Sequence, residues 1–242
     1  MVLPTANVSE RLYAPPSLAI STVIFSIRNG TVDQDEPGLG ELWLPLVRRT
    51  RPPYVDRWAL PGGPIAWDES LEDAAHRNLH ETTQLRPRYL EQLYAFGAVE
   101  RSPDLRVVSI VYWALVQADE AAKATEGDNV SWFAADDVPR LAFDHNEIVE
   151  YALWRLRTKV EYSTIAHNFL GETFTLAQLR EVYEAVLGRR IDPANFRRQM
   201  RASKDLVATD QTVTGGKHRP PRLYRFGETE APQTTPPSSS TL

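Results

Sequence analysis

The 242-residue sequence contains no cysteine. Disulfides and thiolate metal sites are therefore excluded, so the fold must rest on its hydrophobic core. The opening residues, MVLPTANVSERLYAPP, have neither a basic start nor an apolar run, so we expect no signal peptide. The apolar stretch AISTVIFSI is too short to span a bilayer. These absences predict a cytoplasmic protein without a membrane partner.

Charge is distributed unevenly along the chain. Residues 1–171 hold 16 Lys and Arg against 24 Asp and Glu, a net charge of −8, whereas residues 172–227 hold 11 against 6, a net charge of +5. The last two acids, Glu228 and Glu230, bring the total to −5. A basic module on an acidic body suits a polyanionic partner, although small domains often differ this much in charge.

The first part of the sequence predicts a sheet followed by a helix. Runs of β-branched and aromatic residues predict strands at 18–28, 41–48, 89–100, 106–117 and 130–133. Asp144 caps a helix whose apolar side consists of Ile148, Ala152, Leu153 and Leu156. The connector that follows, 159–170, is expected to be packed through Tyr162, Ile165 and Phe169.

Residues 60–85, LPGGPIAWDESLEDAAHRNLHETTQL, combine a glycine turn with a helix. The glycine pair after Pro61 predicts a tight turn, and Ser70 begins a helix with Asp73 as its capping partner. Apolar residues four positions apart predict a buried stripe of Leu71, Ala75 and Leu79. One side of the helix carries Asn78, Glu81 and Thr82.

This stretch resembles the Nudix box. The pattern of that family is a Gly, five residues, a Glu, seven residues, Arg-Glu, an aliphatic residue, any residue, Glu-Glu, any residue, Gly and an aliphatic residue. The matching positions are Gly63, Glu69, Arg77, Leu79, Glu81 and Leu85. Asn78, Thr82 and Gln84 stand where the family has Glu, Glu and Gly. The alternative is an acidic amphipathic helix that follows a turn by chance.

The departures bear on metal binding. In the Nudix family the helix carboxylates hold Mg²⁺ or Mn²⁺ on a diphosphate, and such hard cations prefer charged oxygens. Asn78 and Thr82 remove two of these charges, each worth about 4 kcal/mol of attraction at ~4 Å and an effective dielectric of 20, before desolvation. Glu69 and Glu81 remain, which leaves weak Mg²⁺ binding open but argues against two-metal chemistry. We therefore predict no catalytic residues and no required cofactor.

The second part of the sequence opens with a strongly marked helix. Thr175 and Gln178 have the spacing of a capping box. Phe174 and Leu179 have the spacing of a hydrophobic staple, and Gly188 ends the helix. Asp192 then caps a second helix that has proline at its first position. Two capped helices joined by a short turn predict a helix-turn-helix.

The second helix has two distinct faces. Phe196 and Met200 point to the core, whereas the opposite side carries Ala194, Arg197, Arg198 and Arg201. Strands at 206–212 and 223–226 flank a basic turn that includes Lys217, His218 and Arg219. A cationic helix beside such a wing suits the major groove of DNA. The alternative is a small helical domain with a solvated basic face.

A Nudix domain followed by a winged helix resembles the Nudix-related transcriptional regulators of NAD metabolism, the NrtR type. The resemblance is carried by the altered box and by the segments LAFDH at 141–145, YSTIA at 162–166 and NFRR at 195–198. It implies an α/β fold with an N-terminal Nudix α/β/α sandwich and a C-terminal winged helix-turn-helix. We place the Nudix part at 1–157, the winged helix at 158–227 and a disordered tail at 228–242.

The resemblance also implies a function. In that family the Nudix domain senses ADP-ribose or a related nucleotide. The protein is a homodimeric repressor of NAD biosynthesis or salvage genes, and the ligand releases the operator. For this chain it implies binding of double-stranded operator DNA through Asn195, Arg197, Arg198, Arg201, Lys217, His218 and Arg219.

Several residues near the box are candidates for holding the nucleotide. A diphosphate can be met by Arg48, Arg49, Arg51 or Arg57, and adenine can stack on Trp58 or Phe143. Glu69 and Glu81 complete the set of candidate ligand-binding residues. Surface cations are more often solvated and aromatic residues more often belong to the core. His76 and His145 have no nucleophile beside them, so we interpret them as solvated or structural.

Three hypotheses therefore stand. The first is a DNA-binding repressor with a non-catalytic nucleotide sensor. The second is a working ADP-ribose pyrophosphohydrolase that uses Glu69 and Glu81 with recruited acids and also binds DNA. The third is a protein-interaction module whose basic face meets an acidic partner.

Overall fold

The computed structural model describes residues 15–28, 39–124, 129–212 and 220–227. Its elements follow one another as β1 (Ser17–Arg28), β2 (Glu41–Arg48), β3 (Trp58–Ala59), β4 (Gly62–Pro64), α1 (Leu71–Thr83), β5 (Tyr89–Phe96), a 3₁₀ turn (Val99–Arg101), β6 (Val107–Val116), α2 (Ala118–Ala121), β7 (Val130–Ala134), α3 (His145–Tyr162), a 3₁₀ turn (Ile165–Phe169), α4 (Leu176–Leu187), α5 (Pro193–Ala202), β8 (Leu206–Thr212) and β9 (Arg222–Phe226).

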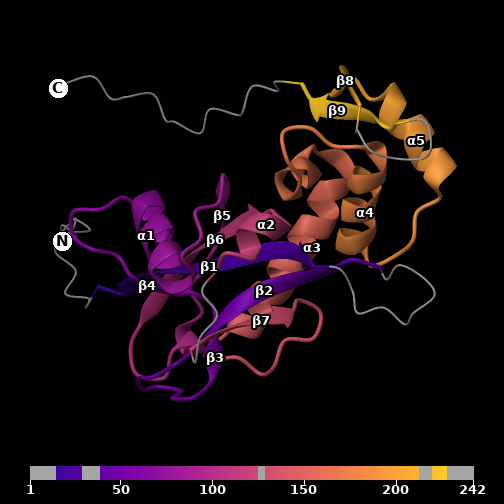
Figure 1. Cartoon of the computed structure of the whole chain (residues 1–242). Coiled ribbons are helices and arrows are strands. Elements are labelled where there is room, and N and C mark those ends of the chain that lie inside the picture. Colours follow the sequence, from indigo (N-terminus) through magenta and orange to yellow (C-terminus); the bar gives the residue numbers. More distant parts are fainter. Residues whose placement is uncertain (1–14, 29–38, 125–128, 213–219, 228–242) are drawn as a thin grey trace, which may run out of the picture.

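A mixed seven-stranded sheet forms the centre of the first part (Figure 1). Its order is β3-β2-β1-β6-β5, with β4 paired to β1 and β7 paired to β2. The two middle strands, β1 and β6, run parallel, and the other pairs are antiparallel. The strand expected at 41–48 is confirmed, whereas the one expected at 89–100 ends at Phe96, because a 3₁₀ turn follows it.

The middle strands are buried on both faces. Along β1, Val23 and Phe25 belong to the core beneath α3, whereas Ile24 packs with Leu79 of α1. Because successive side chains of a strand point to opposite faces, this alternation places α1 on one side of the sheet and α3 on the other (Figure 1). The predicted α/β/α sandwich is confirmed.

Helix α1 begins and packs largely as the sequence indicated. The Ser70 hydroxyl accepts the Asp73 backbone N–H at 3.1 Å, and Ala75 and Leu79 are buried. The prediction for Leu71 was wrong, because its side chain is 37% exposed. This residue opens the first turn, ahead of the turn in which Ala74 and Ala75 reach the sheet.

The second part is a winged helix. Helices α4 and α5 have the predicted caps, since Thr175 and Gln178 form a complete capping box and Asp192 accepts the Asn195 backbone N–H at 2.8 Å. Strands β8 and β9 pair antiparallel, and Phe174 bridges to Tyr224 of β9. The predicted basic turn with Lys217, His218 and Arg219 and the predicted tail at 228–242 lie outside the described residues.

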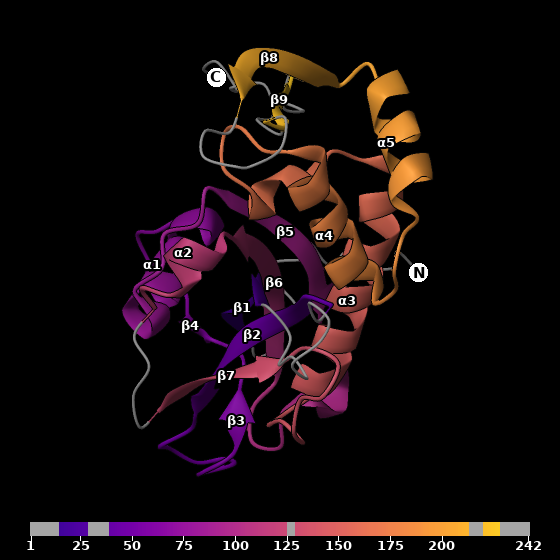
Figure 2. The ribbon, with the colours of Figure 1, turned by 45° about the vertical axis from the view of Figure 1, so that its right-hand side comes forward.

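Helix α3 connects the two parts. Figure 2 shows it running beside the sheet toward α4, and its buried residues share one hydrophobic cluster with both the sheet and the winged helix. The predicted boundary at 157/158 falls within this helix. None of the helices in the described ranges has the length and apolarity that crossing a bilayer would require.

Two side chains around α3 differ from expectation. Tyr162 is 66% exposed, because it ends the helix outside the cluster that buries Ile165 and Phe169. Asp144 occupies the N-cap position, but its carboxylate makes no capping bond: Arg101 holds the carboxylate, and the Asp144 backbone is not extended. The connector is therefore packed through Ile165 and Phe169, and the prediction for Tyr162 was wrong. Asp144 stands at the predicted N-cap position of α3 but makes no capping hydrogen bond.

The capping box of α4 gives a direct test of what holds the winged helix. Thr175→Ala should lower the free energy of unfolding by about 1 kcal/mol, because the first turn loses a side-chain acceptor. Chemical denaturation measures this loss. Thr173→Ala is the matched control, since Thr173 is exposed and precedes the cap. Equal stability of the two variants would contradict the role given to the box.

Candidate ligand cavity and nucleic-acid interface

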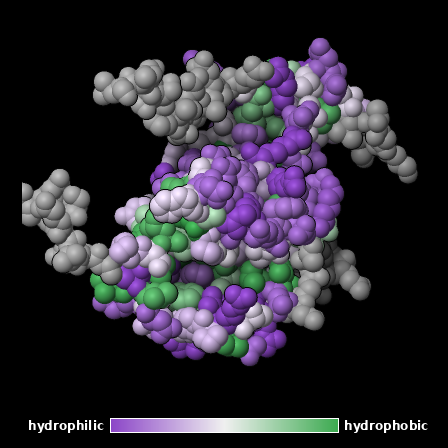
Figure 3. Space-filling model, turned by 90° about the vertical axis from the view of Figure 1, so that its left-hand side faces the viewer, coloured by the Kyte–Doolittle hydropathy of each residue, from purple (hydrophilic) through white to green (hydrophobic). Residues whose placement is uncertain are grey.

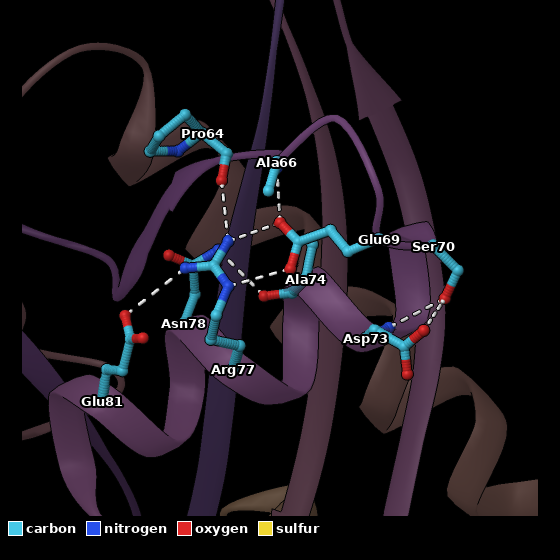
Figure 4. Close-up of polar contacts among 9 residues, drawn as sticks. All are labelled: Pro64, Ala66, Glu69, Ser70, Asp73, Ala74, Arg77, Asn78 and Glu81. Carbon is cyan, nitrogen blue, oxygen red and sulfur yellow. Dashed lines mark hydrogen bonds and ion pairs between the residues drawn. The ribbon is translucent and has the colours of Figure 1, made fainter.

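The two acids that remain in the altered box are both held by Arg77 (Figure 4). The guanidinium Nε and Nη2 donate to the two oxygens of Glu69 at 2.8 and 2.5 Å, and Nη1 lies 3.4 Å from Glu81. The Arg77 hydrogen bond and the Ala66 N–H lower the pKa of Glu69 to about 2. Glu69 is thus ionised but already paired with a cation and a backbone donor.

The substituted positions of the box serve the helix backbone. Asn78 is buried and its amide donates to the Ala74 carbonyl at 2.9 Å, while the Thr82 hydroxyl donates to the Asn78 carbonyl at 2.7 Å. A Cβ at Gly62 would lie 2.2 Å from the Ile20 carbonyl oxygen, so the turn requires glycine there, and a Cβ at Gly63 would lie 2.4 Å from the Asn78 side-chain oxygen. Across the described residues, no cluster of three or more His, Cys, Asp and Glu has a metal-binding arrangement.

A cavity of about 400 Å³ lies beside the glycine turn. Its walls come from β1, β4, β6, the loop 49–53 and the residues around the start of α3. This volume falls in the range of small-molecule sites. Figure 3 views the face that carries α1 and β4, where hydrophobic residues surround a hollow.

Two of the predicted ligand-binding residues meet in this cavity. Arg49 and Phe143 both line it, with the guanidinium carbon 4.7 Å from the ring centroid. The Phe143 ring also packs edge-on against Tyr54 at 5.0 Å. A cation and a fixed aromatic face are the groups that a nucleotide's phosphate and base require.

A second pocket of about 250 Å³ shares part of the same wall. It is lined by Arg48, Arg49, Arg51 and Thr82. Arg49 lines both pockets, so the basic loop borders each of them. Arg48 is also paired with Asp56 at 3.0 Å on the surface.

Four other candidates line neither of these two pockets. Arg57 is exposed and lies over the Tyr54 ring at 5.6 Å. Trp58 is half-buried and packs edge-on against Phe133 at 5.1 Å. The carboxylates of Glu69 and Glu81 are turned toward Arg77. Their roles in ligand binding stay predictions.

The cavity contains two buried groups that sequence reasoning did not place there. Arg101 lines the wall and makes a two-pronged ion pair with Asp144, at 2.9 and 2.8 Å. His145 is buried, as its structural interpretation requires, and its Nδ1 accepts the Leu60 backbone N–H at 2.9 Å. Arg101 lies between the strands predicted at 89–100 and 106–117, and no local pattern identifies its partner, which is 43 residues away.

The winged helix carries a cationic groove of about 770 Å³ between α5 and the β8–β9 sheet. Arg197, Arg201 and Arg222 line it. Arg198 is exposed outside the groove and donates to the Asn195 side chain at 2.8 Å. Sequence reasoning missed Arg222, since this residue follows the basic turn instead of belonging to it. The remaining candidates, Lys217, His218 and Arg219, lie outside the described residues.

Comparisons with known proteins agree with this architecture. The profile of the NUDIX domain matches residues 30–152, and that of the NrtR DNA-binding winged helix domain matches residues 166–226. The ADPR responsive transcriptional repressor NtrR of Acinetobacter baylyi is 33% identical over 219 residues, which cover 88% of this chain and 83% of the relative. The ADP-ribose pyrophosphatase of Methanocaldococcus jannaschii is 30% identical over 146 residues, 60% of this chain and 78% of that protein.

A solved structure extends the likeness to both domains. NrtR of Shewanella oneidensis has a TM-score of 0.72 at 34% identity, with 87% of this chain and 94% of that chain covered. Its complex with a 27mer DNA gives a TM-score of 0.70 at 33% identity over 87% and 93% of the two chains. The fold is that of a Nudix domain joined to a winged helix. The chain belongs to the NrtR family.

His145 should make stability depend on pH. Burial, together with the charges of Arg101 and Arg49, lowers its pKa from 6.5 to about 3. Between these values the unfolded chain binds a proton that the folded chain excludes. The stability that neutral His145 contributes to the folded state is therefore complete above pH 6.5. As the pH falls toward 3, the free energy of unfolding decreases by up to ~1.4 kcal/mol per pH unit.

Urea unfolding at a series of pH values measures this contribution. His145→Asn keeps an acceptor for the Leu60 N–H but does not titrate, so its free energy of unfolding should fall less steeply with decreasing pH than that of the wild type. The other titrating groups are the same in both proteins, so they affect both free energies of unfolding alike. If the free energies of the two proteins fell in parallel between pH 6.5 and 3, the role given to His145 would be wrong.

Proposed function

We propose that the protein is a transcriptional repressor of NAD biosynthesis or salvage genes that binds double-stranded operator DNA. In this proposal its Nudix domain senses ADP-ribose or a related nucleotide without hydrolysing it. The observation that carries the proposal is the cationic groove beside α5, on a winged helix whose Shewanella relative is solved with DNA. The Acinetobacter relative, by its name, responds to ADPR.

The DNA side of the proposal rests on charge and shape. Arg197 and Arg201 are one helical turn apart on the exposed side of α5, while Phe196 is buried beneath them. A helix that presents cations beside a wing fits the major groove and its phosphates. The net charge of +5 over residues 172–227 favours the same partner.

The sensing side rests on the altered box. A sensor must hold its ligand without destroying it, and a two-metal mechanism needs free carboxylates to clamp the diphosphate. Here Asn78 and Thr82 satisfy helix carbonyls, and Arg77 holds the acids that remain. The adjacent cavity retains a cation and an aromatic ring in Arg49 and Phe143. This supports binding without turnover, with no metal required and at most weak Mg²⁺ binding.

The alternative is an active ADP-ribose pyrophosphohydrolase that also binds DNA. The likeness to the Methanocaldococcus pyrophosphatase favours it. In this alternative Glu69 and Glu81 would have to leave Arg77 and recruit further acids. A third reading, in which the basic face meets an acidic protein, predicts no preference for a DNA sequence.

We extend the proposal to a homodimer in the cytoplasm. A palindromic operator presents two half-sites, one helical turn apart or a multiple of it, to two recognition helices. One winged helix in each chain therefore requires two chains to fill such a site. Sedimentation of the protein with and without operator DNA tests this stoichiometry.

Restoring the missing acids tests the sensing side. Asn78→Glu combined with Thr82→Glu should create Mg²⁺- or Mn²⁺-dependent cleavage of ADP-ribose, because two carboxylates return to the metal-binding side of α1. Chromatographic detection of AMP, with and without EDTA, measures it. The wild type should show no metal-dependent product under the same conditions.

The matched control is Asn78→Gln with Thr82→Gln, which adds similar volume without charge. Thermal unfolding must first establish that both double variants fold. A folded Glu variant without activity would contradict the argument from lost metal ligands. Rapid cleavage by the wild type would favour the hydrolase.

Replacing a groove arginine tests the DNA side. Arg201→Ala should weaken binding to an operator duplex by about 1–3 kcal/mol if the side chain reads a base. If it contacts phosphate, binding to all sequences should weaken alike and the salt dependence should become shallower by about one unit. Fluorescence anisotropy over a salt series, with a duplex that the wild type selects from a random library, distinguishes these outcomes.

Lys123→Ala is the control for that experiment, since Lys123 is exposed and lies in the first domain. It should bind the duplex as the wild type does. Unchanged binding by Arg201→Ala would remove this residue from the interface. Failure of the wild type to select any sequence would favour the acidic-partner reading.

A further inference from the structure

Arg101 is a buried cation in the wall of the ligand cavity with one nitrogen unused by the protein. Only 5% of its side chain is exposed. Its Nε and Nη2 donate to the two carboxylate oxygens of Asp144. Among the residues that the structure describes, Nη1 has no hydrogen-bond acceptor, although Arg101 borders the cavity. The guanidinium can therefore meet an anion from the cavity.

The partner of Arg101 also has an alternative bond to make. Asp144 is the N-cap residue of α3, where aspartate normally accepts a backbone N–H of the first turn. That capping bond is absent here: Arg101 holds both carboxylate oxygens, and the Asp144 backbone, at φ −93° and ψ 19°, is not in the extended conformation usual for an N-cap. A free Asp144 would be favoured at this end of the helix by both the unpaired N–H groups and the helix dipole.

Other groups in the cavity favour an anionic ligand at this point. Arg49 lines the same cavity, and the charges of Arg101 and Arg49 both lower the pKa of His145. The two cations therefore converge on the region where neutral His145 lies. A diphosphate offers several charged oxygens, so it can engage Arg49 while competing with Asp144 for Arg101.

We propose that Arg101 is an anion-binding residue of this cavity, and that a nucleoside diphosphate draws it from Asp144, which then caps α3. The proposal rests on the proposed function, because it takes the cavity to be the nucleotide site. Ligand binding thus replaces the Arg101–Asp144 ion pair with one between Arg101 and the diphosphate, and it adds an Asp144 cap to α3. Occupancy of the cavity is thereby coupled to the conformation of α3.

Helix α3 can pass such a change to the winged helix. Thirteen residues beyond Asp144, Arg157 donates through Nε to the Val186 carbonyl of α4 at 3.0 Å. Its Nη2 also binds Asp136, which follows β7, at 2.8 and 2.6 Å. The apolar side of α3 shares a cluster with the buried side of α4. A shift at the start of α3 therefore moves elements that support α5.

The test uses Asp144→Asn in the full-length protein, with ADP-ribose as the probe. A neutral residue releases Arg101 and can still cap the helix, so calorimetry should give about three- to tenfold tighter ADP-ribose binding. The variant should also resemble the liganded state. Its operator affinity should shift in the direction that ADP-ribose shifts the wild type, and added ADP-ribose should then have a smaller effect.

A second variant tests whether Arg101 itself binds the ligand. Arg101→Met alone would leave Asp144 buried without a counter-ion, so the change is made as Arg101→Met with Asp144→Asn. This pair should bind ADP-ribose at least tenfold more weakly than Asp144→Asn. Glu91→Gln, which removes the Lys159 ion pair elsewhere on α3, is the control and should bind as the wild type does.

The outcomes separate the two proposals. If the wild type does not bind ADP-ribose, the proposed function loses its ligand. If the wild type binds it but Asp144→Asn and the double variant bind equally well, the role of Arg101 is wrong and the sensor stands. If ligand affinities change as expected while operator affinity and its response stay those of the wild type, the coupling through α3 is wrong.

Discussion

Burial of α3 is the constraint on which the rest of the structure depends. Its apolar residues join a single hydrophobic cluster that reaches from Val23 in the sheet to Tyr224 in the wing strand. Removing apolar area from water on both sides fixes the winged helix against the Nudix domain. The winged helix is therefore packed against the Nudix domain through a shared hydrophobic cluster. The same helix begins at the wall of the ligand cavity, so one element belongs to the cavity, the core and the domain contact.

The packing of α1 does not depend on the two family carboxylates that Asn78 and Thr82 replace. What holds α1 on the sheet is the Ser70 cap and the burial of Ala74, Ala75 and Leu79. None of these needs a carboxylate at position 78 or 82. Asn78 fits against the glycine turn, where its amide bonds a helix carbonyl. Side chains that satisfy the helix backbone thus stand at two carboxylate positions of the family pattern without disturbing the sandwich.

Sequence patterns predicted the elements better than the site. Strand β8 has the expected bounds, 206–212, and the capping box at Thr175 is complete, because these features depend on neighbours a few residues away. Leu71 and Tyr162 were misplaced, since periodicity states which side of a helix is apolar but not how far the neighbouring layer extends. Arg49 and Phe143 were two of several candidate ligand residues, and the sequence did not show that they contact each other, because no local pattern records contacts between residues so far apart in the chain.

The sequence by itself determined the local structure: the caps, the turns, the alternation of strands, the missing acids and the basic second half. The caps, turns and strand alternation depend on residues within about one turn of one another, where backbone geometry fixes the contact. The missing acids and the basic second half can be read directly from the residue types. Only the tertiary structure decided that Arg101 holds Asp144 and that His145 accepts the Leu60 N–H, 85 residues away. Such pairs form because a closed core leaves a buried charge or donor no water to bind, and no periodicity records which distant partner will be there.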